Sequence, residues 1–550
     1  MITEPPANIL VRGTNWVGDA VMTLPAVSAL AAAFPQSRLS VLTRPWAAGV
    51  YEHHPQVAEV IGHDRDGAHR GLIGRFKLAG QLKRRGFDLA VLFQNAFEAA
   101  LMAFMARAPE RWGYARDSRS FLMTKAIRLE PADRFIHESF YYLNILERAG
   151  LPAPFSLPRL TPKPEAARDA EQLFREAGLK EGEFWLALAP GAAFGSAKRW
   201  PVENFAEAAR LILDEAAGQG QGRALILGGQ GEMDVAAELA ALLPDRALNV
   251  AGRTSLAVSL GLLKRADLLL ANDSGLMHLG GALGVPLAAA FGPTNPLTTA
   301  PLGRSRLVRS AAPCSPCLKR ECPLPRRICF DGVTPELMAA EALSLLENSS
   351  SPGLRPAVFL DRDGTINVEV DFLSRPEDLR LIDGAAEAVA ALNKAGLAVV
   401  VVSNQSGLAR GLFTSDDLAK VQRRLEELMA EKGARIDGFY FCPHHPAGSV
   451  PELAIDCDCR KPAPGLFQKA AAELSLDPAR SFWVGDRLRD LKASAAFKGR
   501  SVLVLTGYGL SEVQKPMDFQ PSLVAPDLRR AAEWVVAVAA AGLGASSPQL

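Results

Sequence analysis

Ala357-Val358-Phe359-Leu360-Asp361-Arg362-Asp363-Gly364-Thr365-Ile366-Asn367 is the stretch that decides the fold of the C-terminal third of this chain. Its first four residues are apolar and are typical of a buried parallel strand, and Asp361 and Asp363 follow on the next loop. In open α/β sheets, ligands bind at the edge where the strands end. Two aspartates there suit Mg²⁺-assisted phosphoryl transfer, in which one attacks phosphorus and the other moves a proton. A calcium-binding or solvated turn can have the same residues, so other motifs of the chain must decide between these interpretations.

Three later segments favour the catalytic interpretation. An apolar strand from Leu397 ends at Ser403, whose hydroxyl can hydrogen-bond a phosphoryl oxygen. Lys461, in Cys459-Arg460-Lys461-Pro462, supplies a positive charge for the phosphate and the nucleophile. A further strand, Ser481 to Asp486, ends in an acid and is followed by Asp490, which we expect to lie outside the metal ligands. A doubly wound α/β sheet would bring these strand ends to one edge.

Two short cysteine motifs predict a zinc site in the same region. Cys442-Pro443-His444-His445 and Cys457-Asp458-Cys459 offer four ligands for tetrahedral zinc, with His444 rather than His445 at the fitting position. The alternative is chance thiols beside surface histidines. Four protein ligands leave no open position, so the ion would be structural and would position the loop that carries Arg460 and Lys461.

The order Asp-x-Asp-Gly-Thr, Ser, Lys and Gly-Asp resembles the four motifs of the haloacid dehalogenase superfamily phosphatases. With the cysteine motifs, residues 357–542 resemble the D-glycero-D-manno-heptose 1,7-bisphosphate 7-phosphatases. The resemblance implies that Asp361 becomes an aspartyl phosphate and that Asp363 is the general acid/base. It also implies Mg²⁺ ligation by the carboxylates of Asp361 and Asp486 and by the backbone carbonyl of Asp363. The substrate contacts that it implies are Glu369, Val370, Asp371, Phe372, Ser403, Asn404, Gln405, Ser406, Arg460, Lys461 and Arg487.

Two further features bear on the phosphatase resemblance: one residue that differs from relatives and one short segment after the first motif. Arg487 stands where relatives often have lysine, which keeps the charge and changes the geometry. Only a short segment separates Asn367 from Asp383, so we expect no large cap domain and a fairly open site.

The N-terminal part repeats a strand–loop–helix pattern that is typical of doubly wound sheets. Asn8 to Gly13 is a strand with a glycine turn, and Asp19 stands near the start of the next helix. An acid at that position is favoured by the helix dipole, which is the alternative to a catalytic role. The small-residue loop Pro190 to Pro201 follows a strand and offers backbone amides and Lys198 to a pyrophosphate. Asn272 to His278 ends a third strand and opens a helix; a capped helix with a core-edge histidine is the alternative.

Together, Asn15 to Pro25, Pro190 to Pro201 and Asn272 to His278 resemble the ADP-heptose:lipopolysaccharide heptosyltransferases of glycosyltransferase family 9, most closely heptosyltransferase II, over residues 7–346. The resemblance implies a GT-B pair of Rossmann-like domains, with Asp19 as general base on the acceptor hydroxyl and no metal requirement. It places around ADP-heptose the residues Lys198, Glu232, Asp273, Ser274, Gly275 and His278, although Asp234 competes with Glu232 for the nucleotide-binding position.

Chain length, composition and linker-like segments predict the domain organisation. The 550 residues are 48% hydrophobic and 22% charged, an ordinary globular balance for several domains. We predict a GT-B acceptor domain at 1–163, an ADP-heptose domain at 164–346, a linker at 347–356, a phosphatase domain at 357–542 and a disordered tail at 543–550. The 61 Lys and Arg nearly balance the 60 Asp and Glu, which gives no reason to expect nucleic-acid binding.

Two further features lie between Arg304 and Cys329. Cys314, Cys317, Cys322 and Cys329 are either metal ligands or free thiols of an ordered loop. The cations Arg304, Arg306, Arg309, Lys319, Arg320, Arg326 and Arg327 form a basic strip that suits either solvent or an anionic glycolipid.

We therefore expect a cytoplasmic bifunctional enzyme of lipopolysaccharide core synthesis, with peripheral contact at the inner membrane. One half would transfer heptose from ADP-heptose to an inner-core acceptor, and the other, with Mg²⁺ and Zn²⁺, would remove the 7-phosphate of heptose 1,7-bisphosphate. The absence of a signal-peptide pattern and of a 20-residue apolar run supports this location. The alternatives are a histidinol-phosphate phosphatase in the C-terminal half and a non-catalytic sugar-nucleotide or glycolipid binding module in the N-terminal half.

Overall fold

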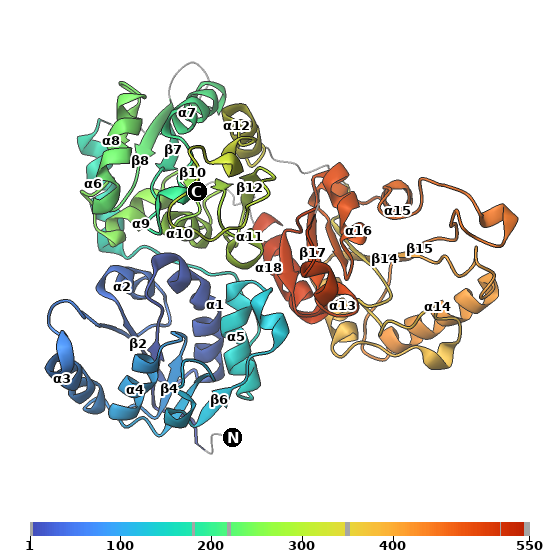
Figure 1. Cartoon of the computed structure of the whole chain (residues 1–550), viewed down its shortest axis with the longest axis horizontal. Coiled ribbons are helices and arrows are strands. Elements are labelled where there is room, and N and C mark those ends of the chain that lie inside the picture. The colour runs from blue at the N-terminus through green and yellow to red at the C-terminus, as the bar shows by residue number, and fades with distance from the viewer. Residues whose placement is uncertain (1–3, 179–181, 217–221, 347–352, 518, 544–550) are drawn as a thin grey trace. The chain divides into compact units, whose positions relative to one another are not determined.

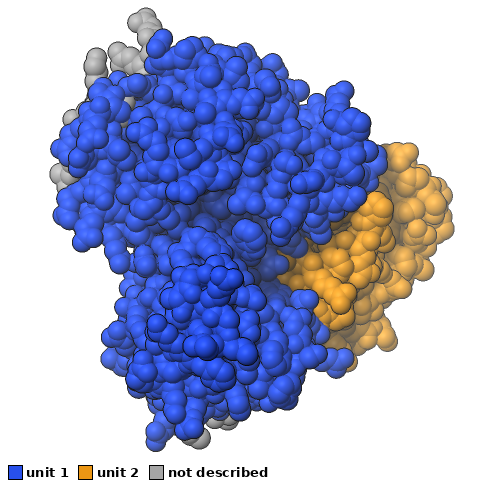
Figure 2. All heavy atoms as spheres, turned by 60° about the vertical axis from the view of Figure 1, so that its left-hand side comes forward, with its two compact units in different colours: residues 1–129, 138–347 blue, residues 130–137, 348–550 orange. Residues whose placement is uncertain are grey.

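The computed structural model describes residues 4–178, 182–216, 222–346, 353–517 and 519–543 (Figure 1). The chain divides into two compact units, residues 1–129 with 138–347 and residues 130–137 with 348–550 (Figure 2). Of the predicted linker, 347–352 lies outside the described residues, as does 544–550 of the predicted tail. No described helix is both long and apolar enough to cross a membrane.

Parallel sheets with helices between their strands confirm the predicted α/β class. The first sheet has the order β3-β2-β1-β4-β5-β6. Its strands are β1 (Asn8–Arg12), β2 (Arg38–Thr43), β3 (Glu59–Gly62), β4 (Leu89–Leu92), β5 (Glu110–Tyr114) and β6 (Lys125–Ile127). The helices that go with it are α1 (Val17–Ala33), α2 (Pro45–Glu52), α3 (Gly71–Lys83), α4 (Phe97–Met105) and α5 (Glu138–Arg148), with a 3₁₀ turn η1 (Ser120–Leu122).

The second sheet belongs to the same unit and has the order β12-β11-β10-β7-β8-β9. Its strands are β7 (Phe184–Ala189), β8 (Gly222–Ile226), β9 (Ala247–Asn249), β10 (Leu268–Asn272), β11 (Leu287–Phe291) and β12 (Ser305–Arg309). Its helices are α6 (Pro164–Glu176), α7 (Val202–Ala216), α8 (Met233–Ala241), α9 (Leu256–Lys264), α10 (Gly275–Leu283), α11 (Pro296–Thr299) and α12 (Pro335–Leu343).

The third sheet forms the second unit, with the order β15-β14-β13-β16-β17-β18. Its strands are β13 (Ala357–Leu360), β14 (Ala398–Asn404), β15 (Gly438–Cys442), β16 (Phe482–Gly485), β17 (Arg500–Val504) and β18 (Leu523–Ala525). Its helices are α13 (Ala385–Lys394), α14 (Ser415–Ala430), α15 (Gly465–Glu473), α16 (Leu488–Leu491), α17 (Gly509–Val513) and α18 (Leu528–Leu543). Between Asn367 and Asp383 the chain forms only the 3₁₀ turn η6 (Pro376–Asp378), so no cap domain is inserted there.

Each sheet reverses its winding direction at one place, and this place positions a site. When the strands of each sheet are counted along the chain, all three sheets have the order 3-2-1-4-5-6, so the first and fourth strands are neighbours and their crossovers run in opposite directions. The loops that follow these two strands diverge and leave a crevice at the carboxyl edge. The pairs are β1 with β4, β7 with β10, and β13 with β16.

Candidate active sites

Three carboxylates meet where β13 and β16 end. Asp361 follows β13, Asp486 follows β16 and Asp490 lies in α16; a carboxylate oxygen of each lies within 4.8 Å of the other two. The buried Lys461 ammonium is 2.7 Å from Asp361 Oδ1 and 2.8 Å from Asp490 Oδ1. Asp490 therefore contacts the lysine that holds the predicted nucleophile.

These carboxylates carry more negative charge than one lysine balances. Burial and then Asp490 raise the pKa of Asp361 to about 6, although Lys461 opposes the change. Burial and then Asp361 raise the pKa of Asp486 to about 8. Asp486 Oδ1 is buried and has no hydrogen-bond partner among the described residues. Unpaired, crowded oxygens are the donor set that Mg²⁺ prefers, so the residues fit that ion.

Asp363 lies in a different environment from Asp361. Arg362 binds its carboxylate with both Nε (3.1 Å) and Nη2 (2.8 Å), and Asn367 and Gln405 donate further hydrogen bonds at 3.0 and 3.2 Å. Burial acts to raise the pKa of Asp363, but the charge and hydrogen bonds of Arg362 outweigh it, so the pKa is lowered. Its carboxylate is outside the metal-type cluster, which leaves the backbone carbonyl as the group that the sequence resemblance assigns to Mg²⁺.

The predicted substrate residues line one pocket of about 260 Å³. All of those from Glu369 to Phe372 and from Ser403 to Ser406 are present, together with Arg460, Lys461 and Arg487. Four arginines line the pocket, and two of them, Arg410 and Arg489, were not predicted from the sequence. A pocket with this many cations suits a substrate with more than one anionic group.

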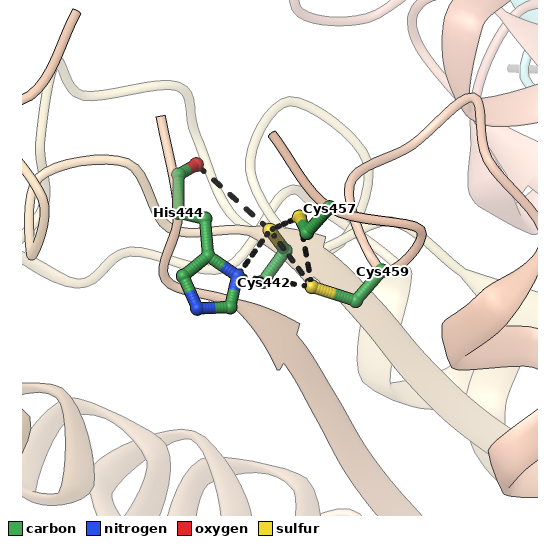
Figure 3. Close-up of side chains that lie close together, drawn as sticks. All are labelled: Cys442, His444, Cys457 and Cys459. Carbon is green, nitrogen blue, oxygen red and sulfur yellow. Dashed lines mark hydrogen bonds between the residues drawn. The ribbon is translucent and has the colours of Figure 1, made fainter. Parts of the chain in front are cut away.

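The four predicted zinc ligands converge on one point (Figure 3). The sulfurs of Cys442, Cys457 and Cys459 lie 3.1–3.5 Å apart, and His444 Nδ1 is 3.2 Å from the sulfur of Cys459. All three cysteines are free of disulfides. Burial and the two neighbouring thiols raise the pKa of Cys459, so a cation is needed to hold all three as thiolates. The donor set fits a closed tetrahedral zinc site.

One hydrogen bond of the loop after Cys459 joins the cysteine–histidine cluster to this pocket, and a second holds the loop to another pocket residue. Arg460 donates to the carbonyl of His444 at 3.1 Å. The backbone N–H of Lys461 donates to Asn404 Oδ1 at 3.0 Å. His445 is not in the cluster: it lines the pocket, and its Nε2 is 3.1 Å from Arg410.

In the first unit, the start of α1 lies against the start of α10. A Cβ on Gly18 would be 2.8 Å from His278 Cδ2, and one on Gly275 would be 3.0 Å from Val17 Cβ. Asp19, in the first turn of α1, is close enough to Lys198 and Asp273 for both charges to act on it. Burial raises the pKa of Asp19 to about 6, Lys198 opposes this and Asp273 adds to it. The two sheets thus bring the predicted base and the predicted diphosphate residues together.

Side-chain contacts hold the loops after β7 and β10 together at one edge of the sheet. Lys198 Nζ is 2.6 Å from Asp273 Oδ2, which also accepts a hydrogen bond from Thr294. Asn272 is fully buried and joins the loops by donating to the carbonyl of Pro190 at 2.7 Å. The hydroxyl of Ser274 is buried and has no hydrogen-bond partner among the described residues.

Glu232 rather than Asp234 lies at this edge. Its Oε2 accepts the Gly229 N–H at 2.8 Å, and a Cβ on Gly191 would be 2.2 Å from its carboxylate. Asp234 is exposed on α8. Only glycine at position 191 therefore lets the β7 loop approach the acid.

The cysteine loop between Ala312 and Cys329 supports the Lys198 loop. The Arg320 carbonyl accepts the Ala197 N–H at 3.0 Å, and Arg327 donates to the Ser196 carbonyl at 2.9 Å. In the described chain, its four cysteines are not among the groups whose ligand atoms lie within 4.8 Å of one another. Burial and then the neighbouring Cys314, Cys322 and Cys317 raise the pKa of Cys329 to about 11, so the four thiols lie near one another.

Comparisons with known proteins give relatives for both halves of the chain. The chain is 44% identical over 182 residues to the D-glycero-β-D-manno-heptose-1,7-bisphosphate 7-phosphatase of Escherichia coli O6:H1, covering 33% of this chain and 88% of that protein. The Yersinia pestis enzyme of the same name is 46% identical over 153 residues, covering 28% and 81%. The chain belongs to the D-glycero-β-D-manno-heptose-1,7-bisphosphate 7-phosphatase family. Residues 458–531 also match a HAD-hydrolase-like model.

This phosphatase-family chain carries a second enzyme type. Residues 75–327 match glycosyltransferase family 9 (heptosyltransferase). The solved E. coli ADP-heptose LPS heptosyltransferase II is 26% identical, with a TM-score of 0.52, over 62% of this chain and 98% of that one. A family 9 glycosyltransferase from Veillonella parvula has the same fold at a TM-score of 0.56 and 24% identity, over 63% and 98%. The predicted fusion and its GT-B fold are confirmed.

Two residues that contact or influence the predicted catalytic aspartates of this heptose phosphatase-family chain were not predicted from the sequence. Arg362 stands inside the Asp-x-Asp motif, but its bond to Asp363 needs a fixed loop conformation. Glu138 is far from Asp19 in sequence, yet burial and then Asp19 raise its pKa to about 7. Asp19 and Glu138 come near each other because α1 packs against α5.

Proposed function

We propose that this chain catalyses two reactions of lipopolysaccharide core synthesis: inverting transfer of heptose from ADP-heptose to an inner-core acceptor, and hydrolysis of the 7-phosphate of heptose 1,7-bisphosphate. The observation that carries the second activity is the convergence of Asp361, Lys461 and the Asp486 carboxylate at one switch point, in a domain of this phosphatase family. The first activity rests on the meeting of Asp19 with Lys198 and Asp273 in a family 9 fold.

In the phosphatase half, Asp361 attacks phosphorus, the P–O bond to the C7 oxygen breaks and an aspartyl phosphate forms. Lys461 holds Asp361 in place and offsets its charge. Asp363 gives a proton to the departing oxygen and later takes one from the water that cleaves the acyl phosphate. Its lowered pKa favours the anion, which is the form that accepts the proton from water.

Two metals complete this half. Mg²⁺, held by Asp361, Asp486 and the backbone of Asp363, would supply positive charge to the phosphoryl oxygens. Zn²⁺ on the Cys442, His444, Cys457 and Cys459 set would be structural. Through Arg460 and Lys461 it would fix the two cations that meet the phosphates.

In the transferase half, Asp19 takes the proton from the acceptor hydroxyl, which attacks the anomeric carbon as the bond to ADP breaks. Lys198, the Ser274 hydroxyl and the backbone amides at the start of α10 stabilise the diphosphate. Glu232 binds the nucleotide. No metal is assigned to this step. We expect the reaction to take place in the cytoplasm, with the chain in peripheral contact with the membrane that carries the acceptor.

One assay separates the phosphatase proposal from its alternative. Phosphate release from heptose 1,7-bisphosphate should greatly exceed release from histidinol phosphate, because Arg410, Arg460, Arg487 and Arg489 all line the pocket and the second substrate has a single phosphate. Preference for histidinol phosphate would reject the proposed substrate. Tight ADP-heptose binding without product from any acceptor would instead make the N-terminal half a binding module.

A further inference from the structure

The carboxyl edge of the first sheet carries an unusual set of exposed apolar side chains. On α3, Leu72, Ile73 and Phe76 are 69%, 86% and 65% exposed. Further exposed aromatic residues stand at the starts of α2 and α4 and in η1: Trp46, Phe97 and Phe121. We call these six side chains the apolar rim. Single exposed apolar residues are common on soluble proteins, but six along one edge mark a contact surface.

The chain topology puts the rim on the same edge as Asp19. All strands of this sheet are parallel, so each helix or turn that follows a strand starts at the carboxyl edge. Asp19 stands in the first turn after β1, and the rim residues stand early in the elements that follow β2, β3, β4 and β5. The rim therefore borders the proposed acceptor site.

The fold of α3 does not need its rim residues. Its buried residues are Gly74, Leu78, Ala79 and Leu82, and the last three pack with core residues of β1 to β4. Leu72, Ile73 and Phe76 lie on the opposite, exposed side. Arg75 pairs with Glu98 at 3.0 Å and ties α3 to the start of α4, and the rings of Phe97 and Phe121 lie 6.2 Å apart with their planes tilted by 45°. The rim is thus held in place without being part of the core.

Charge around α3 identifies the kind of partner. Between His63 and Gly86 the chain has seven Lys and Arg against two Asp. Lys77, Lys83 and Arg84 are exposed. A helix with bulky apolar residues beside cations is typical of segments that lie in the interface of an anionic bilayer. The basic strip is a weaker candidate, because Arg306, Arg326 and Arg327 bind groups of their own domain.

We propose that the apolar rim inserts into the headgroup region of an anionic lipid bilayer and presents the Asp19 edge to an acceptor anchored there. Leu72, Ile73 and Phe76 form the inserted tip, and the α3 cations contact lipid phosphates. The inference rests on the proposed transferase function, since it names the surface on which that reaction takes place.

Co-sedimentation of the full chain with vesicles of phosphatidylethanolamine and phosphatidylglycerol tests the proposal. The triple variant Leu72→Ser, Ile73→Ser, Phe76→Ser should partition at least about tenfold more weakly than wild type. The matched control is the triple variant of exposed leucines elsewhere in this unit: Leu318→Ser, Leu324→Ser and Leu337→Ser. It should bind as wild type does. Wild-type binding should also weaken in high salt and on phosphatidylcholine vesicles.

Activity separates this inference from the transferase proposal. The rim variant should keep wild-type turnover on a delipidated, soluble acceptor and lose it on the same acceptor embedded in vesicles. Equal vesicle binding by wild type and the rim variant overturns the inference, as does a wild-type dimer that the rim variant converts to monomer without any vesicle binding. A wild type that binds vesicles but transfers no heptose to either acceptor rejects the transferase function and leaves membrane docking standing.

Discussion

Lys461 is a buried cation between two carboxylates, 2.7 Å from the partly buried Asp361 and 2.8 Å from the buried Asp490. Taking such charges out of water costs several kcal/mol per ion, and their attraction often does no more than offset that cost. Stability alone is therefore a poor reason to keep this group. A catalytic role explains this charged group better, because the nucleophile and the cation must be in position before the phosphate binds.

Asp19 should set the acidic limit of the transferase. A general base works ionised, so kcat/KM for heptose transfer should be at its plateau above pH 7 and fall as pH drops through about 6, the pKa to which burial raises Asp19. Initial rates between pH 5 and 8 measure this. Asp19→Asn should lose about 100- to 10,000-fold in turnover and still bind ADP-heptose. A profile flat to pH 5 would remove Asp19 from the base role.

The same pKa has a consequence for stability. The folded pKa of Asp19 lies above its ordinary value of 3.8, so ionisation disfavours the folded state. Asp19→Asn should therefore melt at a higher temperature than wild type at pH 7.5. That advantage should shrink as pH falls from about 6 and be gone below 3.8. Thermal melts at pH 7.5 and 4 in parallel measure it, and lower stability of the variant at pH 7.5 would contradict the buried ionised state.

Gly364 should be required for the cation site. Its φ is +77°, and a Cβ there would lie 2.2 Å from Asp486 Oδ2. Gly364→Ala should displace Asp486 and raise the Mg²⁺ concentration needed for half-maximal phosphatase activity by about tenfold or more. Gly384→Ala is the matched control: its φ is +79°, but its Cβ would meet only Arg529, at 3.5 Å. Both variants have the same backbone strain, about 1–2 kcal/mol, so equal Mg²⁺ dependence would refute the steric account.

At the scale of elements, we expect the cysteine–histidine cluster to affect substrate binding through the loop from Cys459 to Lys461. Cys457→Ser with Cys459→Ser should abolish zinc binding, measured as metal per chain. It should also raise KM for heptose 1,7-bisphosphate, because the loop that carries Arg460 and its hydrogen bond to His444 is no longer held. The control is Cys314→Ser with Cys317→Ser, which should leave the phosphatase KM unchanged. Loss of zinc without any change in KM would confine the ion to local stability.

Strand ends were the part of the fold that the sequence predicted well. An apolar run followed by Asp, Ser, or Asn-Asp-Ser-Gly marks both the end of a buried strand and a ligand edge, because parallel strands point their carboxyl ends the same way. For this reason the sequence located β13, β14, β16 and β10 together with their polar residues. The four predicted zinc ligands also lie close together in the sequence, so their grouping could be predicted without knowledge of distant contacts.

Contacts between distant elements were not predictable in this way. Arg410 and Arg489 reach the phosphate pocket only once β14 and β16 have been placed beside β13. Glu138 meets Asp19 through the packing of α5 on α1. Exposure likewise depends on the folded surface. An apolar helix such as α3 is usually buried, and only the structure shows that one of its apolar faces is uncovered.

At the scale of the whole molecule, one strand order occurs three times and serves two reactions. Two sheets with the order 3-2-1-4-5-6 share the transferase site, and the third holds the phosphatase site by itself. The two proposed reactions are not consecutive, since the phosphatase product must still be activated with ADP before transfer. The fusion thus requires only that both sites be present, each complete within its own unit.

The central claim is that one chain holds two separate active sites, and a crossed assay tests it most directly. Heptose transfer and phosphate release are measured on wild type, Asp19→Asn and Asp361→Asn. We predict that Asp361→Asn loses phosphate release and keeps transfer, and that Asp19→Asn does the reverse. If either variant lost both activities while remaining folded, or lost neither, the account of two independent sites would be contradicted.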